Sequence, residues 1–304
     1  MFSPEIALQQ LSNALQLGAI YALIALGYNM VYGILALINF AHSQVFMVSG
    51  FIAYFISLFV IKTVHLAFPF SLCLTTVCTM VIASALGAGI ERLAYRPLRR
   101  APKMSALITA LSVSIFLENF TLAVVGPGRK QLPEALFPTA MYQMGGVVVT
   151  NIQIAIVILG IVVLLVLRAL VNGTQIGRAM RAVSVDVPAA SLMGVDVNRI
   201  IAFTFLVGSS LAALGGIMYG LAYPVIETNM GTMVGWKAFC AAVIGGIGSI
   251  EGAYIGALVL GTVEILVPFL LKSQYRDGIV FGLLILMLVF RPTGIFGVVK
   301  SEKV

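Results

Sequence analysis

Long apolar segments without charged residues constrain the fold of this chain more than any other feature. Residues 152–167 read IQIAIVILGIVVLLVL with one polar side chain, and residues 279–290 read IVFGLLILMLVF with none. A helix needs about 20 mostly apolar residues to cross a membrane, whereas a membrane β-strand alternates apolar and polar residues over ~10. Because these segments are continuous, they predict membrane-spanning helices rather than a β-barrel.

The composition supports a membrane protein and excludes several other classes. Of the 304 residues, 61% are hydrophobic and only 10% are charged. Soluble chains average about 25% charged residues, and so few charges could not cover the surface of a soluble domain. A soluble enzyme, a disordered protein and a nucleic-acid-binding protein are therefore excluded. We predict an all-α polytopic membrane protein, with residues 1–304 forming a single transmembrane domain.

Nine segments are candidate spans, so that we expect about 8–10 transmembrane helices. A further segment, residues 28–42, is apolar but interrupted, and it predicts a broken or re-entrant segment. The candidate spans cover residues 6–27, 43–61, 70–90, 105–125, 152–170, 200–222, 234–248, 253–271 and 278–290.

Basic residues are concentrated in alternate loops and thereby predict the orientation in the membrane. Three regions hold 12 of the 18 lysines and arginines, namely Arg92, Arg96, Arg99, Arg100, Lys103, Arg168, Arg178, Arg181, Arg199, Arg291, Lys300 and Lys303. Cytoplasmic loops are enriched in Lys and Arg, so these regions and the C-terminus are predicted to be cytoplasmic. Residues 126–151 then form an extracytoplasmic loop, with a short interfacial helix expected at 133–137. The N-terminus would lie outside with nine spans and inside with eight or ten.

The cytoplasmic loop of residues 172–199 contains a short helix with recognisable ends. Asp186 is expected to cap it, because a carboxylate accepts the free N–H groups of a first helical turn. Pro188 fits that first turn, and Gly194 fits the left-handed position after the last turn. Leu192, Met193 and Val195 then leave apolar surface outside the membrane. Two alternatives are open: this surface packs back onto the chain's own helices, or it inserts into a groove of a cytoplasmic partner.

Several motifs together resemble one transporter family over essentially the whole chain. The motif G-R-A-M-R-A at residues 177–182 and the A-A-x-x-x-G core at 189–194 are similar to the cytoplasmic coupling loop of ABC importer permeases. Residues 27–42 (GYNMVYGILALINFAH), 240–257 (CAAVIGGIGSIEGAYIGA) and 291–297 (RPTGIFG) resemble signatures of branched-chain amino-acid permeases. The chain is thus similar to the shorter, LivH-type permease subunit of branched-chain amino-acid ABC transporters.

The resemblance implies the ABC importer permease fold and ATP-driven import of branched-chain, hydrophobic amino acids across the bacterial inner (plasma) membrane. It implies four kinds of partner: a second permease subunit in a heterodimer, two cytoplasmic ABC ATPases that bind ATP and Mg, a periplasmic or extracellular substrate-binding protein, and the lipid bilayer. The implied ATPase-coupling residues are Gly177, Arg178, Asp186, Ala189, Ala190, Leu192, Met193 and Gly194.

Two positions depart from the family's pattern. N-F-A-H is usually followed by glycine and glutamate, whereas this chain has Ser43 and Gln44, so no formal charge is expected near the pathway there. Pro188 stands where the coupling loop often has an acidic residue, but Asp186 can still act as the cap. Because of the first departure, a permease for urea or short amides in the same family is the nearest alternative. An ion-coupled secondary amino-acid transporter is a second.

Polar side chains within the spans are the candidates for a transport pathway, because such groups usually face a bundle interior or a cavity. The candidate pathway or gate residues are Asn39, His42, Gln44 and Glu264. Asn39 and His42 are expected in a hydrogen-bonded turn of the broken segment. Glu118 is expected to make an interhelical hydrogen bond that fixes packing. Lys237 is expected to snorkel toward the membrane surface.

A glycine-rich stretch and several missing motifs complete the interpretation. The candidate turn or hinge residues are Gly245, Gly246, Gly248 and Gly252. The sequence contains no G-x-x-x-x-G-K-[ST] P-loop, no H-E-x-x-H and no G-x-S-x-G motif. We therefore expect no catalytic residue, metal site or cofactor in this chain, and the energy for transport must come from another subunit.

Overall fold

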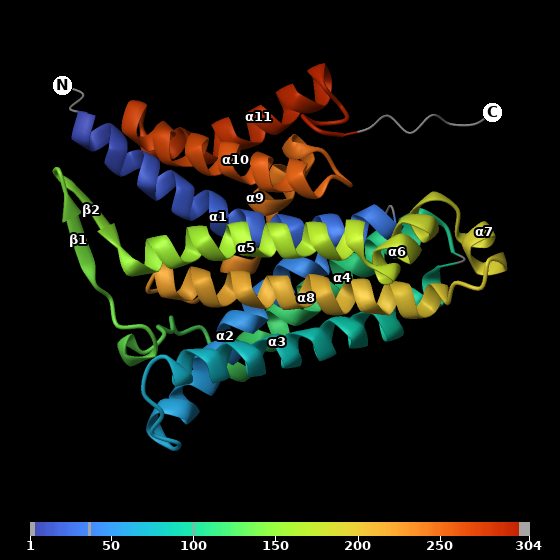
Figure 1. The fold of residues 1–304 in the computed structure, drawn as a ribbon, viewed down its shortest axis with the longest axis horizontal. Coiled ribbons are helices and arrows are strands. Elements are labelled where there is room, and N and C mark those ends of the chain that lie inside the picture. The colour runs from blue at the N-terminus through green and yellow to red at the C-terminus, as the bar shows by residue number, and fades with distance from the viewer. Residues whose placement is uncertain (1–3, 36–37, 100, 298–304) are drawn as a thin grey trace.

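The protein is a bundle of helices that run back and forth along one axis (Figure 1). The computed structural model describes residues 4–35, 38–99 and 101–297, so that Arg100, Lys300 and Lys303 lie outside the described residues. The helices are α1 (Pro4–Leu35), α2 (Ala41–Lys62), α3 (Phe70–Ile90), α4 (Lys103–Val125), α5 (Asn151–Gly173), α6 (Gln175–Val185), α7 (Val187–Leu192), α8 (Val197–Ala222), α9 (Met230–Gly245), α10 (Ile250–Leu270) and α11 (Arg276–Phe290). Shorter turns are η1 (Glu91–Tyr95), η2 (Arg96–Leu98), η3 (Glu134–Leu136) and η4 (Ser273–Tyr275), and a hairpin is formed by β1 (Met141–Met144) and β2 (Val147–Thr150).

The bundle has two different ends. The hairpin end contains β1, β2 and the start of α1, where the Gln9 side chain exchanges two hydrogen bonds with the Val148 backbone. The basic end contains α6, α7 and the segment of residues 291–297 (Figure 1). Within the described residues, α1 to α5, α8, α10 and α11 run between these ends, and the shorter α9 leads from α8 back toward the start of α10 at the basic end. The described chain therefore starts at the hairpin end and finishes at the basic end.

The predicted helical membrane architecture is confirmed. In the part of the chain that is described, eight helices are long and apolar enough to cross a membrane, and α9 is a shorter apolar helix. The 16 residues of α9 extend only ~24 Å, against ~30 Å of membrane hydrocarbon. The non-helical residues 223–229 precede it. Within them Ile226 is fully buried and exchanges backbone hydrogen bonds of 2.7 and 2.9 Å with Lys130, so its backbone groups are paired.

The break expected in residues 28–42 is shorter than predicted. Helix α1 continues without interruption to Leu35, and α2 already begins at Ala41. Of the connecting residues 36–40, residues 36 and 37 lie outside the described residues. His42 thus belongs to the first turn of α2 and not to a broken segment.

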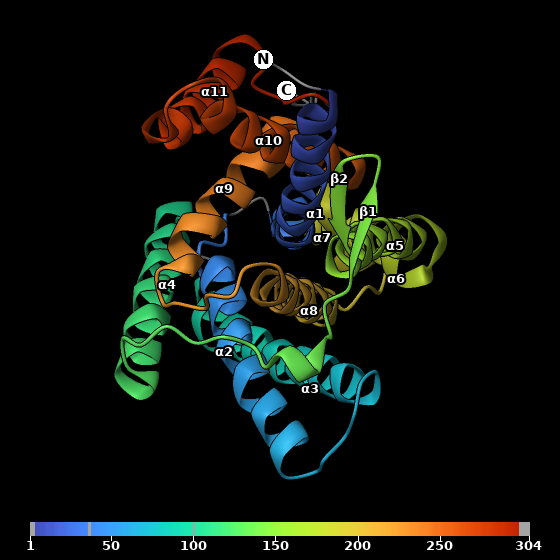
Figure 2. The ribbon, with the colours of Figure 1, turned by 90° about the vertical axis from the view of Figure 1, so that its left-hand side faces the viewer.

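Helix α1 forms the centre of the bundle because it is apolar on every face. It packs against α10, α8, α5 and α9, and Figure 2 shows it enclosed between α10 and α8. Glycine permits the closest of these crossings. A Cβ atom on Gly261 of α10 would lie 2.5 Å from the backbone nitrogen of Gly18 in α1. The two helices therefore touch through their backbones.

We predict that Gly261→Leu separates α1 from α10 and lowers the stability of the folded protein by about 1–3 kcal/mol, as overpacking does in other cores. The thermal unfolding midpoint of the purified protein in detergent measures the effect. Gly282→Leu is the matched control, because Gly282 in α11 is exposed and a Cβ there meets nothing within 4 Å. Equal midpoints for the two variants would contradict the backbone contact.

The hairpin end differs from the prediction. The interfacial helix expected at residues 133–137 is a single 3₁₀ turn, η3, and the strands β1 and β2 were not expected. Met144 pairs with Val147, so the connection is the two-residue turn Gly145–Gly146, where both φ angles are positive. Two glycines between extended residues are a recognised signal for this type of hairpin. A hydropathy pattern cannot reveal two strands of only four residues each.

Candidate functional site

At the basic end, the chain between α5 and α8 forms a helical arm, here called the α6–α7 arm (Thr174–Asp196). The predicted caps of its short helix are confirmed. The Asp186 carboxylate accepts a hydrogen bond of 2.9 Å from the Ala189 backbone, Pro188 lies in the first turn, and Gly194 has a φ of +83°. These features end α7 on both sides and keep it at six residues.

The apolar tip of the arm does not pack on the chain itself. Leu192 and Met193 are 88% and 85% exposed, whereas Ala190 on the opposite side of α7 is buried. Leu192 and Met193 therefore do not pack back onto the chain's own described helices, whereas Val195 is half-buried and packs against the core. Two large apolar side chains held outside the bundle form a surface suited to a protein partner.

The arm is fixed to the bundle by α6, a helix that the sequence analysis missed. Thr174 caps α6 by accepting a hydrogen bond of 3.0 Å from Gly177. Gly177, Met180 and Val183 recur every third residue and are buried toward the bundle. A Cβ atom on Gly177 would lie 2.2 Å from the Val171 carbonyl oxygen, so only glycine permits this approach to α5. Arg178 lies on the exposed side of α6.

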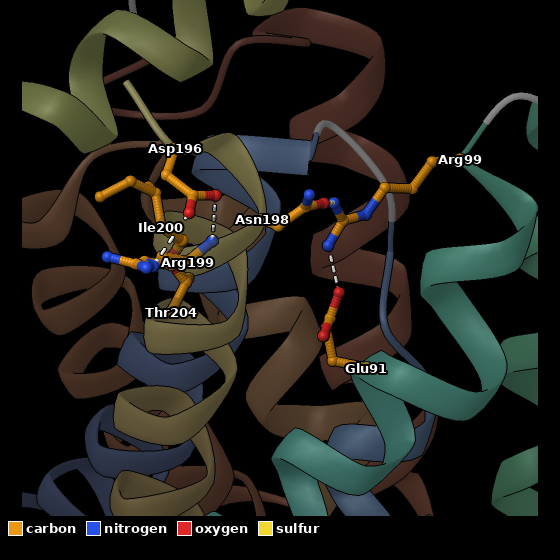
Figure 3. Close-up of polar contacts among 7 residues, drawn as sticks. All are labelled: Glu91, Arg99, Asp196, Asn198, Arg199, Ile200 and Thr204. Atoms are coloured by element: carbon orange, nitrogen blue, oxygen red, sulfur yellow. Dashed lines mark hydrogen bonds and ion pairs between the residues drawn. The ribbon is translucent and has the colours of Figure 1, made fainter. Parts of the chain in front are cut away.

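The far end of the arm is connected to two further helices (Figure 3). Asp196 caps α8 by accepting a 3.1 Å hydrogen bond from Arg199. Two residues after that cap, the Asn198 side chain accepts a 2.6 Å hydrogen bond from Arg99, whose guanidinium also pairs with the buried carboxylate of Glu91 at the end of α3. A displacement of α7 would thus be passed to the starts of α8 and η1.

A polar cluster lies where α2, α4 and α9 meet, with Gln44 buried and Glu118 and Thr232 half-buried. The Gln44 amide donates hydrogen bonds of 3.1 Å to the Glu118 carboxylate and 3.0 Å to the Thr232 hydroxyl. Thr232 in turn donates a 2.9 Å bond to Glu118. The interhelical hydrogen bonds expected of Glu118 are therefore present. The expectation that no formal charge lies near position 44 is wrong, because the charge is supplied by Glu118 from another helix.

This cluster forms one side of a cavity of about 190 Å³. Its polar lining comes from Ser43, Ser114, Glu118 and Thr232, and its aromatic lining from Tyr28, Phe40, Trp236 and Phe239. The rings contact one another, with centroids 5.1 Å apart for Phe40 and Trp236 and 5.9 Å for Phe40 and Phe239. The cavity thus combines one carboxylate with an aromatic wall.

Asn39 and His42 lie beside this region, at the start of α2. The Asn39 side chain accepts hydrogen bonds from the Ala41 backbone at 3.1 Å and the Tyr95 hydroxyl at 2.7 Å, which is the hydrogen-bonded turn expected there. His42 is 1% exposed and packs edge-on against Tyr28. A Cβ atom on Gly27 would lie 2.4 Å from the His42 ring, so the two helices are in close contact at this point.

Glu264 lies in a separate charged cluster near the hairpin end. Its carboxylate accepts a 2.6 Å hydrogen bond from Tyr21 and pairs with Lys237 at 2.6 Å and Arg276 at 3.5 Å. Lys237 also pairs with Asp277 at 2.8 Å. The expectation that Lys237 snorkels to the membrane surface is wrong, since its side chain is buried in this cluster. Within the described part of the chain, Glu264 and Gln44 share no hydrogen-bond or ion-pair partner, and the charge of Glu264 is neutralised by Lys237 and Arg276.

The glycine-rich stretch forms a tight turn between α9 and α10. Helix α9 ends at Gly245. The next two glycines of the turn, Gly246 and Gly248, have positive φ angles of +113° and +94°. Gly252 already lies in α10. The segment of residues 291–297 closes this turn, because Ile295 and Phe296 donate backbone hydrogen bonds of 3.0 and 2.9 Å to the last carbonyls of α9. The Asn29 side chain binds the Gly248 and Ser249 backbones from α1. The turn is therefore held from two sides.

Comparison with known proteins shows which family the chain belongs to. A family model described as "Branched-chain amino acid transport system / permease component" matches residues 10–289. The chain belongs to this family. Within residues 4–35, 38–99 and 101–297 the permease has no group of three or more His, Cys, Asp or Glu side chains that could hold a metal ion.

Individual relatives match this permease along almost its full length. It is 43% identical to the high-affinity branched-chain amino acid transport system permease protein BraD of Pseudomonas aeruginosa, over 99% of this chain and 100% of the relative. It is 42% identical to the high-affinity branched-chain amino acid transport system permease protein LivH of Escherichia coli K12, over 98% of this chain and 97% of the relative. A probable LivH protein of Methanocaldococcus jannaschii is 25% identical over 95% and 92%. No solved structure matches the chain.

The sequence analysis missed Thr232 and the role of Glu118 as a neighbour of Gln44 in this permease. A local signal for α6 was present, because Thr174 is a good capping residue and Met180 and Val183 have helical spacing. No local signal joins Gln44 to Glu118 and Thr232, which are 74 and 188 residues away in sequence. Only the packing of α2, α4 and α9 brings them together.

Proposed function

We propose that this permease is a transmembrane subunit of an ATP-driven ABC importer that carries branched-chain amino acids into the cell. The observation that supports this most strongly is the α6–α7 arm on a member of the branched-chain permease family. Its tip presents Leu192 and Met193 beyond the bundle, held by the caps at Asp186 and Gly194. A rigid helix with an exposed apolar tip is suited to dock in the groove of an ATPase.

The orientation follows from the positions of the charges. At the basic end lie Arg92, Arg96, Arg99, Arg168, Arg178, Arg181, Arg199 and Arg291. At the hairpin end lie Lys62, Arg129, Lys130, Lys272 and Arg276. The excess of basic residues supports a cytoplasmic basic end in the bacterial inner membrane. Residues 172–199 then form the cytoplasmic coupling loop, and residues 126–151 form the extracytoplasmic loop, next to which a substrate-binding protein would deliver its ligand.

The remaining subunits follow from what an importer needs. Two cytoplasmic ATPases would bind ATP and Mg and hold one coupling arm each. A second permease would complete the pathway by covering the side of the bundle where α2, α4 and α9 meet. The exposed side chains of Ile115, Phe116 and Trp236 lie on this side. A carboxylate such as Glu118 is costly beside lipid, which favours a protein partner there.

Transport would be driven by movement of the coupling arm. ATP binding can change the permease only if the ATPases bind one of its conformations more tightly than another. The arm passes a displacement to α8 through the cap at Asp196 and to the end of α3 through Asn198, Arg99 and Glu91. Helices α3 and α8 pack against each other over much of their length, so they would move as one unit relative to α4.

Reconstitution of the complete transporter tests this proposal. The permease, its partner permease and the two ATPases are placed in proteoliposomes with ATP inside and the binding protein outside. We expect uptake of labelled leucine, isoleucine or valine that stops when ATP is omitted. The permease alone should show no uptake under a proton or sodium gradient. Uptake of urea instead of leucine, or gradient-driven uptake by the permease alone, would overturn the proposal.

A further inference from the structure

Glu118 is a half-buried carboxylate in the membrane-spanning helix α4. Its carboxylate accepts hydrogen bonds only from neutral groups, the Gln44 amide and the Thr232 hydroxyl. Among the described residues, no lysine, arginine or histidine forms an ion pair with it. Glu264, by comparison, is neutralised by Lys237 and Arg276. Glu118 and Glu264 are therefore in different electrostatic situations.

The position of Glu118 makes an unpaired charge costly. It lies seven residues before the end of α4, which places it ~10 Å along the helix from that end and within the expected hydrocarbon region. An ionised group at such depth is stabilised by pairing or by a water-filled cavity. The cavity of about 190 Å³ beside Glu118 provides that space.

The walls of the cavity indicate what kind of molecule fits beside the carboxylate. Apart from the polar lining residues, the other lining residues are apolar or aromatic, namely Tyr28, Phe40, Leu111, Ile115, Trp236 and Phe239. Aromatic faces bind aliphatic side chains through apolar contact and also attract cations. A ligand with a cationic group at one end and an aliphatic chain at the other would satisfy both parts of the cavity.

We propose that this cavity is a binding site for the amino acid during transport, and that Glu118 pairs with the α-ammonium group. The aliphatic side chain lies against the aromatic wall. Gln44 and Thr232 hold the carboxylate in place by their hydrogen bonds and act as positioning residues. The inference rests on the proposed function, which it deepens by assigning the group that recognises the ammonium.

Other ligands fit these contacts less well. Urea or a short amide carries no positive charge and would leave the Glu118 carboxylate unneutralised. An inorganic cation would need several oxygen ligands at once, whereas most of the residues that line the cavity are aromatic or aliphatic. The ammonium of a hydrophobic amino acid uses the carboxylate and the apolar wall together.

The experiment measures binding of labelled L-leucine to the purified complex of both permeases and both ATPases in nanodiscs, without the binding protein. Two competitors separate the groups of leucine: isoamylamine keeps the ammonium and the branched chain, and 4-methylpentanoate keeps the carboxylate and the branched chain. We expect isoamylamine to displace leucine from the wild-type complex and 4-methylpentanoate, at the same concentration, to leave it bound. Sodium should have no effect.

The variant Glu118→Gln keeps the size of the side chain and removes its charge. We expect it to bind leucine about tenfold or more weakly, the usual effect of losing a hydrogen-bonded charge. Isoamylamine should no longer displace leucine from this variant. Glu134→Gln is the matched control, because Glu134 is exposed at the hairpin end. It should bind leucine as the wild type does.

Each other result overturns the inference. Unchanged leucine binding by Glu118→Gln would leave Glu118 with a packing role only. Displacement by sodium but not by isoamylamine would make the cavity a site for an inorganic cation. If the variant does not fold, the wild-type competition still decides, since failure of isoamylamine to displace leucine, or no leucine binding at all, rejects the site. ATP-dependent leucine uptake by the wild-type complex shows whether the proposed function survives that rejection.

Discussion

The double substitution Leu192→Asp and Met193→Asp is expected to reduce ATP-dependent uptake by about tenfold or more and to release the ATPases from the permease during purification. Both side chains are more than four-fifths exposed, and a few apolar residues at the centre of an interface usually supply most of its binding energy. Two carboxylates placed in an apolar groove would be desolvated without partners, which is strongly unfavourable. Co-purification of the ATPases and uptake in proteoliposomes measure the two effects.

This substitution should leave the permease folded, because neither side chain packs against its described residues and the cap at Asp186 is unchanged. The unfolding midpoint of the double variant should therefore equal that of the wild type. Met141→Asp is the matched control, since Met141 is also exposed but lies at the opposite, hairpin end of the bundle. A double variant that keeps both its ATPases and its uptake would disprove the docking role of the arm.

The second large effect is expected from Lys237→Met. This change removes the cation closest to Glu264, whose carboxylate is 3% exposed. Breaking a buried ion pair by removing one partner costs about 3–5 kcal/mol, which is a large part of the stability of a typical folded domain. We expect much less folded protein in the membrane, measured by size-exclusion chromatography and thermal unfolding of the purified variant.

The charge balance of this cluster provides the control. Lys237→Met combined with Glu264→Gln removes one charge of each sign, so the double variant should recover much of the lost stability. Lys62→Met, at the exposed end of α2, should have little effect. If Lys237→Met folded normally but transported poorly, the lysine would belong to the pathway. If the double variant were no more stable than Lys237→Met, the pair would not be the source of the effect.

Features that depend on local chemistry could be predicted from the sequence. The spans follow from hydropathy alone, because any segment in lipid must be apolar and satisfy its own backbone. The short helix α7 follows from three residues, Asp186, Pro188 and Gly194, each of which suits one position at a helix end. No knowledge of the tertiary structure is needed for either prediction.

Features that depend on the approach of distant segments could not be predicted in this way. The sequence predicts Lys237 at the membrane surface because it lies near the end of its span, yet its partner Glu264 stands 27 residues further on. Tyr21, which donates to the same carboxylate, is 243 residues from Glu264. The cluster at Glu118 also depends on residues that are distant in sequence, since its neighbours come from α2 and α9. One sequence without aligned relatives contains no signal for such pairs.

The closing of the α9–α10 turn by residues 291–297 sets an order of assembly. The last carbonyls of α9 receive their hydrogen bonds from Ile295 and Phe296, which leave the ribosome only after α9, α10 and α11 have been made. Until then the two helices can enter the membrane, but the connection between them stays incomplete. The final arrangement of α9, which lines the Glu118 cavity, is thus reached only late in synthesis, so that a chain stopped in α11 would lack the two hydrogen bonds that close this turn.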